Sequence, residues 1–240
     1  MIGRVLVIGA VFALAAQVSH SSTVVSNTTF DDWSRVTCVD DDLRGFNLSS
    51  DLIVGANFRF SSFAGADLSN ANISETNFFR TELTGANLTG AMASFTVFSS
   101  AELSGANFEL ADLSDAYFDG AIASSASFVG ATLAVAIIFD ADLTGADLTN
   151  ADLTHADLSN SVLTDADLTG ADLSFAMLRF TEGLDSTISS QTKYNRFTDF
   201  TGTGFDPVAA GWIFVPEPGS SALLVLALGQ LARRSRRRSI

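Results

Sequence analysis

Residues 141–155 read Ala141-Asp142-Leu143-Thr144-Gly145, Ala146-Asp147-Leu148-Thr149-Asn150 and Ala151-Asp152-Leu153-Thr154-His155, three copies of one five-residue unit. The unit repeats in register from residue 41 to residue 180, which makes 28 units, each centred on its third residue. The centre is Leu in 16 units, Phe in 7, Ile in 3 and Ala in 2, and the residue two positions earlier is Ala in 20. Small and large apolar side chains therefore alternate across one polar residue, which is the periodicity of a β-strand.

A period of five residues fits neither an α-helix nor a continuous strand, so each unit is predicted to be one short strand closed by a corner. Within a unit the first residue and the centre point inward, and the residue between them points outward. The last two residues, typically Ser or Thr and then Gly, Asn or Asp, favour turns. Each unit is therefore expected to form one side of a coil.

The spacing of the Phe residues indicates the number of sides, because stacked coils place like residues above one another. Phe58, Phe78, Phe98 and Phe118 are spaced by 20 residues and are predicted to stack in the core. Four units then make one coil, and residues 41–180 make about seven coils, roughly 34 Å long at about 4.8 Å per coil. The expected fold class is all-β, a four-sided parallel β-helix without a register slip.

The pattern Ala-(Asp/Asn)-(Leu/Phe)-(Ser/Thr)-Gly resembles that of the pentapeptide repeat proteins, and the resemblance covers 140 of the 240 residues. It implies a right-handed quadrilateral β-helix and is nearly silent on function. The only small centres are Ala93 and Ala123. Phe98 lies in the predicted coil of Ala93, and Phe108 and Phe118 lie in that of Ala123, so the lost volume is expected to be restored from another side.

The chain begins with a segment typical of export. Arg4 precedes an apolar run from Val5 to Ala16, and the sequence turns polar at Gln17. This order predicts a secretory signal peptide over residues 1–22, with a helical apolar part. An uncleaved N-terminal anchor is the alternative, and the shortness of the run for a bilayer span disfavours it.

Two segments outside the repeat are expected to cover the open ends of the solenoid. Residues 23–40, with Phe30 and Trp33, form the predicted N-terminal cap. Residues 181–214 form the predicted C-terminal cap and linker, which contains five aromatic residues: Tyr194, Phe197, Phe200, Phe205 and Trp212. Cys38 is the only cysteine, so an internal disulfide and a thiolate metal site are excluded. It is expected to be buried, with intermolecular pairing as the alternative.

Residues 215–240 divide into three parts. Val215-Pro216-Glu217-Pro218 precedes an apolar run from Ala222 to Ala232, and five arginines follow: Arg233, Arg234, Arg236, Arg237 and Arg238. This order resembles a PEP-CTERM sorting signal, which implies that an exosortase processes the exported chain near the Pro-Glu-Pro motif. The apolar run is expected to form a short membrane helix with the arginines on the cytoplasmic side, although a full span needs about 20 residues. A soluble helix with a basic end is the alternative.

The body of the chain is strongly acidic. The formal net charge is -14, and without Arg4 and the five tail arginines, 7 basic residues face 27 acidic ones, a net charge of -20. This charge disfavours direct binding to nucleic acid or anionic lipid. The four-sided fold would place Asp147 beside Asp167, and Asp152 beside Asp172, about 5 Å apart.

The acidic columns have three interpretations. Solvation of a flat β surface is the favoured one. The second is weak Ca²⁺ bridging between Asp147 and Asp167 and between Asp152 and Asp172, and no other cofactor is expected. The third comes from the resemblance, because some cytoplasmic pentapeptide repeat proteins act on DNA gyrase as acidic DNA mimics. The two export signals argue against this third interpretation.

The predicted function is that of an exported, non-enzymatic structural or adhesive protein. It would be anchored transiently in the inner membrane and then displayed on the cell envelope or released. The expected partners are the exosortase, extracellular polysaccharide and other copies of the chain, with no nucleic acid. The alternative is an acidic DNA mimic that regulates a DNA-binding enzyme such as gyrase. Catalysis finds no support, since His20 lies at the predicted signal-peptide end and His155 at a corner.

Overall fold

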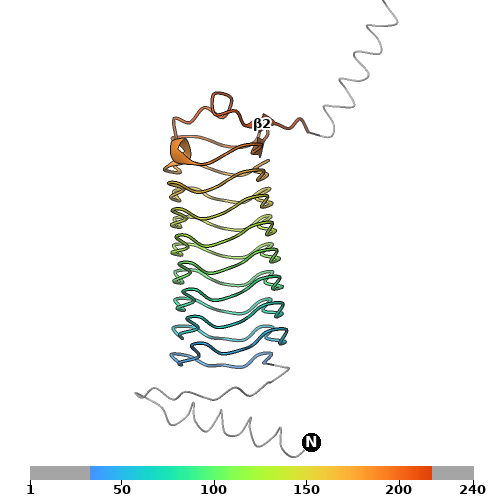
Figure 1. The fold of residues 1–240 in the computed structure, drawn as a ribbon, viewed down its shortest axis with the longest axis vertical. Helices are drawn as coiled ribbons and strands as arrows, with labels where there is room; N and C mark the ends of the chain where they lie inside the picture. Colours follow the sequence, from blue (N-terminus) through green and yellow to red (C-terminus); the bar gives the residue numbers. More distant parts are fainter. Residues whose placement is uncertain (1–32, 218–240) are drawn as a thin grey trace, which may run out of the picture.

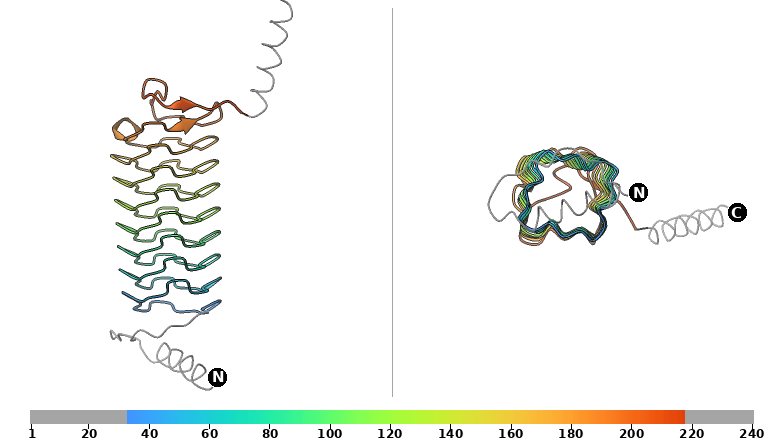
Figure 2. Two further views of the ribbon diagram at one scale, coloured as in Figure 1. Left: turned by 45° about the vertical axis from the view of Figure 1, so that its right-hand side comes forward. Right: turned by 90° about the horizontal axis from the view of Figure 1, so that it is seen from below.

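Stacked four-sided coils form the protein. The structure is a computed structural model that describes residues 33–217. The coils rise along one axis (Figure 1), and their outlines superpose as a quadrilateral when viewed along that axis (Figure 2). Parallel bridges join residues 20 positions apart, as in Asn57 with Asn77 and Val97 with Tyr117. The prediction of an all-β parallel helix with four units per coil is therefore confirmed.

Each corner follows from the last two residues of a unit. The final residue has a positive φ, for example 64° at Gly145 and 58° at Asn150. This left-handed region favours Gly and Asn because they have little steric conflict there. The next unit then starts along a new side, and its strand bonds to the coils on either side: Val162 N donates to Ala141 O over 2.9 Å.

The core is a set of vertical stacks. The rings of Phe58, Phe78, Phe98 and Phe118 lie one above another, with centroids 5.5, 5.5 and 5.0 Å apart. Where Thr or Ser replaces the inward Ala, its buried hydroxyl donates to a backbone carbonyl, as Thr76 Oγ1 does to Ile53 O over 2.7 Å. These polar substitutions are tolerated because the hydroxyl has a partner.

The first coil begins earlier than the sequence pattern indicates. Residues 33–40 were expected in the N-terminal cap, but Trp33 and Cys38 occupy core-centre positions and are buried. Thr37 bridges Asn57, and Trp33 Nε1 donates to Asp51 Oδ2 over 3.1 Å. Trp and Cys serve as centres because they are apolar, although neither belongs to the repeat pattern. The rest of the predicted cap, residues 23–32, lies outside the described residues.

One irregular coil follows residue 180. Its elements are the 3-10 helix η1 (Leu184–Ser186) and the strand β1 (Lys193–Tyr194), which pairs in parallel with the strand β2 (Ile213–Phe214). Bridges join Asp167 to Ile188 and Met177 to Asp199, so the spacing of 20 residues is lost through inserted residues. With this coil and the early start, the column through Tyr117 has nine levels, from Thr37 to Asp199, against about seven predicted coils.

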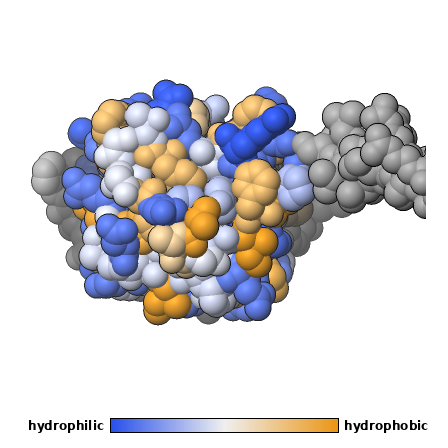
Figure 3. All heavy atoms as spheres, turned by 90° about the horizontal axis from the view of Figure 1, so that it is seen from above, coloured by the Kyte–Doolittle hydropathy of each residue, from blue (hydrophilic) through white to orange (hydrophobic). Residues whose placement is uncertain are grey.

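Aromatic side chains cover the C-terminal end of the helix. Trp212 is buried, and its ring centroid lies 4.9 Å from that of Phe205 and 5.8 Å from that of Phe200. Seen along the axis from this end, apolar and polar residues are interspersed on the surface (Figure 3). Phe197 was expected in this cap but lies outside it, 52% exposed and stacked on Phe175.

The predicted signal peptide (1–22) and the predicted tail helix lie outside the described residues. Among residues 33–217, no helical segment has the length and apolar character of a membrane span.

Candidate functional site

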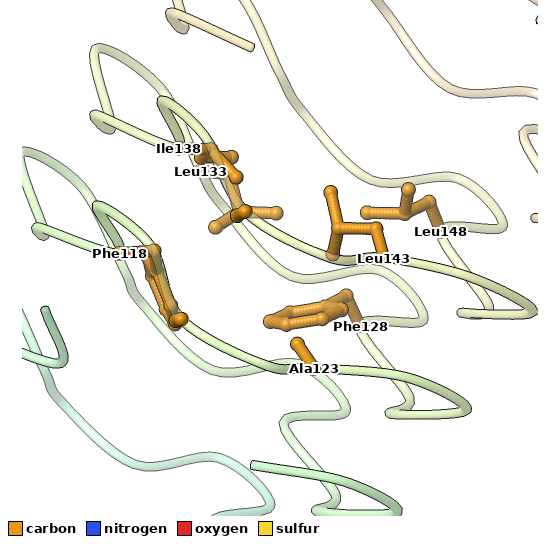
Figure 4. A pocket seen from close by; sticks show the side chains of 9 residues that line it. Phe118, Ala123, Phe128, Leu133, Ile138, Leu143 and Leu148 are labelled. Atoms are coloured by element: carbon orange, nitrogen blue, oxygen red, sulfur yellow. The ribbon is translucent and has the colours of Figure 1, made fainter. Parts of the chain in front are cut away.

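The interior of the described coils is packed with apolar side chains. A cavity of about 10 Å³ lies where the Phe stacks give way to Leu and Ile, between Ala123, Phe128 and Leu143 (Figure 4). Its lining is entirely apolar, so it is expected to be dry. The neighbouring Phe rings therefore restore most of the volume lost at Ala123, but not all of it.

The acidic columns occupy two adjacent faces. Asp147 bridges Asp167, and Asp152 bridges Asp172, so the sequence register is observed. Each of these four carboxylates also accepts a hydrogen bond from the backbone N–H two residues later, as Asp147 Oδ1 does from Thr149 over 2.9 Å. The carboxylates thus hold the corners in place as well as carrying charge. Within residues 33–217 no group of three or more His, Cys, Asp or Glu side chains could hold a metal ion. Weak Ca²⁺ bridging stays the second interpretation of these columns, after solvation.

Hydroxyls from the preceding coil support other carboxylates. Ser124 Oγ donates to Asp142 Oδ2 over 2.8 Å, and Ser94 Oγ donates to Asp112 Oδ2 over 3.2 Å. Burial raises the pKa of both carboxyls, but hydrogen bonds from these serines and from the corner residues outweigh it and leave each pKa below the ordinary value. Both side chains are therefore ionised well below neutral pH.

Two ionisable side chains near the ends of the helix have pKa values shifted in opposite directions. Hydrogen bonds from Thr201, followed by that from Arg179, lower the pKa of Asp199 to about 2. Burial, followed by the charge of Asp41, raises the pKa of the Cys38 thiol to about 12. The thiolate required for disulfide exchange is thus scarce at neutral pH, which disfavours intermolecular pairing through Cys38.

His155 lies in a ladder of rings at successive corners. Its ring centroid lies 4.5 Å from that of Phe175, which in turn stacks on Phe197 at 5.3 Å. Among residues 33–217, the imidazole is thus engaged by an aromatic neighbour rather than by a serine or a carboxylate. The stacked rings pack one coil against the next.

The start of the predicted sorting motif lies along the last coil. Val215 N donates to Tyr194 O over 2.7 Å, and Glu217 Oε1 lies 2.9 Å from Arg196 Nε. Pro216 between them is exposed. The other predicted motif residues lie outside the described residues: Pro218, Arg233, Arg234, Arg236, Arg237 and Arg238.

One face of the helix is apolar on its outside, which the sequence analysis did not predict. We define the aromatic face as the side formed by the units centred on Phe58, Phe78, Phe98, Phe118 and Ile138, with the corners that flank it. Its outward column reads Val97, Tyr117 and Ile137 in three consecutive coils, whereas in the other columns apolar residues such as Met92 and Ile122 stand singly between polar ones. Tyr117 is 37% exposed and Phe139, beside Ile137, is 41% exposed. The signal for this face in the sequence is the presence of three apolar outward residues spaced by 20 positions.

Two arginines of the aromatic face have no acidic partner. Within the described part of the chain, carboxylates pair with Arg44, Arg179 and Arg196, and no ion pair involves Arg59 or Arg80. Instead the guanidinium carbon of Arg59 lies 5.2 Å from the ring centroids of Phe60 and Phe79, and that of Arg80 lies 5.2 Å from the ring of Phe79. The Arg59 Nε is buried without a hydrogen-bond partner. This cluster adds positive charge to an acidic chain.

Comparison with known proteins identifies the repeat. A family model described as pentapeptide repeats matches residues 53–90, 81–119, 96–134, 111–150 and 136–174, half of the chain. No curated protein matches the chain.

Several solved structures are similar. A trypsin-treated form of QnrB1, a plasmid-mediated fluoroquinolone resistance protein, is 20% identical with a TM-score of 0.42, over 81% of this chain and 96% of that one. HetL, involved in heterocyst differentiation regulation in the cyanobacterium Nostoc sp. strain PCC 7120, is 22% identical with a TM-score of 0.30, over 74% and 87%. The Nostoc protein alr5209 is 33% identical with a TM-score of 0.30, over 50% and 84%.

Proposed function

The chain belongs to the pentapeptide repeat family, and from that premise we propose that it is an exported, non-enzymatic structural or adhesive protein. The observation that carries the proposal is the closed interior of the body, whose cavity of about 10 Å³ has only apolar walls. A substrate pocket needs some hundreds of Å³ and convergent polar groups. The body therefore acts through its flat outer faces, as a rigid rod that contacts macromolecules.

The two terminal sequences support export. An apolar run follows Arg4, and the tail combines the Pro-Glu-Pro motif, an apolar run and five arginines. We assign the tail to an exosortase-type sorting enzyme, after a transient stay in the inner membrane, and the body to the cell surface or the medium. Within residues 33–217, the last backbone hydrogen bond between this segment and the coil comes from Val215 N, so cleavage near Pro218 would leave the described coils whole. Extracellular polysaccharide and other copies of the chain are the proposed partners of the body.

The export proposal is tested by a tail variant. In a strain that makes the full chain, replacement of the five tail arginines by Gln is expected to reduce retention in the inner membrane, because the positive cytoplasmic anchor is lost. Arg44→Gln, which removes a cation from the body, is the matched control and should fractionate as the wild type does. Normal retention and processing of the tail variant would contradict the proposal.

A second function is favoured by the paired acidic columns. Asp147 with Asp167, and Asp152 with Asp172, place carboxylates in rows on two adjacent faces, which suits an imitation of the DNA backbone. The partner would be a DNA-binding enzyme such as gyrase, and the chain would act in the cytoplasm. A supercoiling assay with purified gyrase separates the two functions, since the exported rod should leave supercoiling unchanged and a DNA mimic should inhibit it.

A further inference from the structure

Three unfavourable features coincide on the aromatic face: its apolar outward column, strained corners and exposed apolar corner residues. Phe95 and Val135, at the corner that enters this face, have φ values of 59° and 63° and are about half exposed. A branched or bulky residue is strained in the left-handed region, and its exposure to water offers no compensation. None of these features stabilises a lone helix, so they point to a surface that is covered in use.

Two charged corner residues of the aromatic face are arranged symmetrically. Arg80 and Asp140 occupy the same corner column, and three coils, about 14 Å, separate them. Phe79 precedes Arg80 and Phe139 precedes Asp140, so the same Phe-plus-charge pair stands at each end with opposite sign. Val97 and Tyr117 lie between the two pairs.

We infer that the aromatic face binds a second copy of this chain, with the two helices antiparallel. A two-fold axis halfway between the levels of Val97 and Tyr117 inverts the order of the coils and keeps each column opposite itself. Arg80 of one copy then faces Asp140 of the other, and Phe79 faces Phe139. Because the axis repeats every contact, the interface contains two ion pairs and two Phe pairs around an apolar centre.

Other arrangements fit this face less well. In a parallel pair with the axis along the helix, each corner faces the opposite corner of the same coil, so Arg80 would face Glu75 but Asp140 would face Val135. Asp140 would then lack a cationic partner, and Phe79 would no longer face Phe139. Shifting the antiparallel pair by one coil places Asp140 opposite Phe60 or removes it from Arg80. The chosen register is the one that pairs Arg80 with Asp140, while at the opposite corner Glu75 and Asp115 face Val135 and Phe95.

Pairing of two copies through the aromatic face is also compatible with the net charge of the chain. The chain carries a net charge of -14, so association through an acidic face would be repulsive. Among residues 33–217, Arg59 and Arg80 of the aromatic face pair with no carboxylate, and the columns of Asp147 and Asp152 lie on other sides of the helix. Pairing through it keeps the acidic columns in solvent.

This inference deepens the proposed structural role by naming the partner of the body. Its test uses only the self-association of the chain, so its outcome is independent of where the cell sends the protein. A failure of export would leave the pairing intact, and a failure of pairing would leave export untouched.

The test is a charge exchange between two variants of the full chain, Arg80→Asp and Asp140→Arg. Sedimentation velocity of the chain in a mild non-ionic detergent measures the dimer. Each variant alone places like charges opposite each other twice, so self-association should weaken about tenfold or more. An equal mixture of the two should dimerise as the wild type does, because both acidic groups of the first variant then face the two arginines of the second.

The controls separate pairing from folding. Asp165→Arg makes the same change at an equivalent corner of another face, where the φ is 57° against 59° at Asp140, and should dimerise normally. Thermal unfolding verifies that each variant is folded, and Asp140→Asn replaces Asp140→Arg if the latter is not. A wild type that stays monomeric at high micromolar concentration would overturn the inference. So would a dimer that both substitutions leave unchanged, or folded variants that fail to pair when mixed.

Discussion

Phe78 and Phe98 lie one coil apart with their ring planes only 3° from parallel and their centroids 5.5 Å apart. The stack exists because residues 20 positions apart occupy the same place in successive coils. Each ring therefore packs against the ring of the next coil, and the stability of one coil depends on its neighbours.

A charge placed in this stack should disrupt several coils. Phe98→Asp removes about 3–5 kcal/mol of packing and buries a carboxylate without a partner, so the loss of unfolding free energy should exceed about 4 kcal/mol. Thr84→Asp, at an exposed position in a neighbouring coil, is the matched control and should change stability by less than about 0.5 kcal/mol. Circular dichroism during thermal unfolding provides the measurement. An unchanged transition for Phe98→Asp would refute the four-sided register.

Enlarging the existing cavity should be costly. Leu143 lines the cavity beside Ala123, so Leu143→Ala should lower the free energy of unfolding by about 2–5 kcal/mol. The control is Leu110→Ala, since Leu110 is 66% exposed and contributes little to the core. Urea unfolding of both variants gives the comparison, and similar midpoints would show that the core at Leu143 is not packed as described.

Acid should destabilise the helix between about pH 4 and pH 2. The pKa values of Asp112, Asp142 and Asp199 are lowered in the folded state, to about 2 for Asp199. A lowered folded pKa contributes stability above the unfolded value of about 3.9, and this stability disappears as the pH falls through the folded value. The thermal midpoint should thus be nearly constant from pH 7 to about 4 and then fall.

The Asp199→Asn variant isolates one group in this pH profile. It should be less stable than the wild type at pH 7 and approach the wild type near pH 2, because protonation then removes the same interactions in both. Asp206→Asn, with an acidic residue of the same C-terminal segment, is the control. Parallel pH profiles for the wild type and Asp199→Asn would contradict the assigned role of Asp199.

Calcium should have little effect on the described body. Each step of the acidic columns brings two carboxylates together, and Ca²⁺ takes six to eight oxygen ligands. The melting temperature is therefore expected to be the same in millimolar Ca²⁺ and in chelator. A rise with Ca²⁺ that is lost in Asp147→Asn/Asp152→Asn would instead establish bridging at these columns.

The repeat made most of the fold predictable, because a strict period of five residues leaves little freedom once the Phe spacing shows four units per coil. The ends were less predictable. Trp33 and Cys38 extend the first coil although neither fits the pattern of centres, since any apolar side chain of suitable size can fill that place. After residue 180, inserted residues shift the bridge partners to Ile188 and Asp199, and a motif search in steps of five cannot follow them.

The candidate site was predictable only in part. The register of Asp147 with Asp167 follows from the period alone, and the structure has it. The aromatic face is recognised only when Phe79, Tyr117 and Phe139 are seen to lie on one side of the helix. That step requires every outward residue to be assigned to its column. Departures from the repeat at outward positions carry the information about function, and the strength of the inward pattern conceals them.

The intact mass of the protein in each fraction of its native host tests the central claim most directly. The account predicts that the material at the cell surface or in the medium has lost the segment before about residue 22 and the tail from near Pro218, and retains residues 33–217. A chain of full length, 240 residues, confined to the cytoplasm would contradict the account and would favour an acidic mimic of DNA.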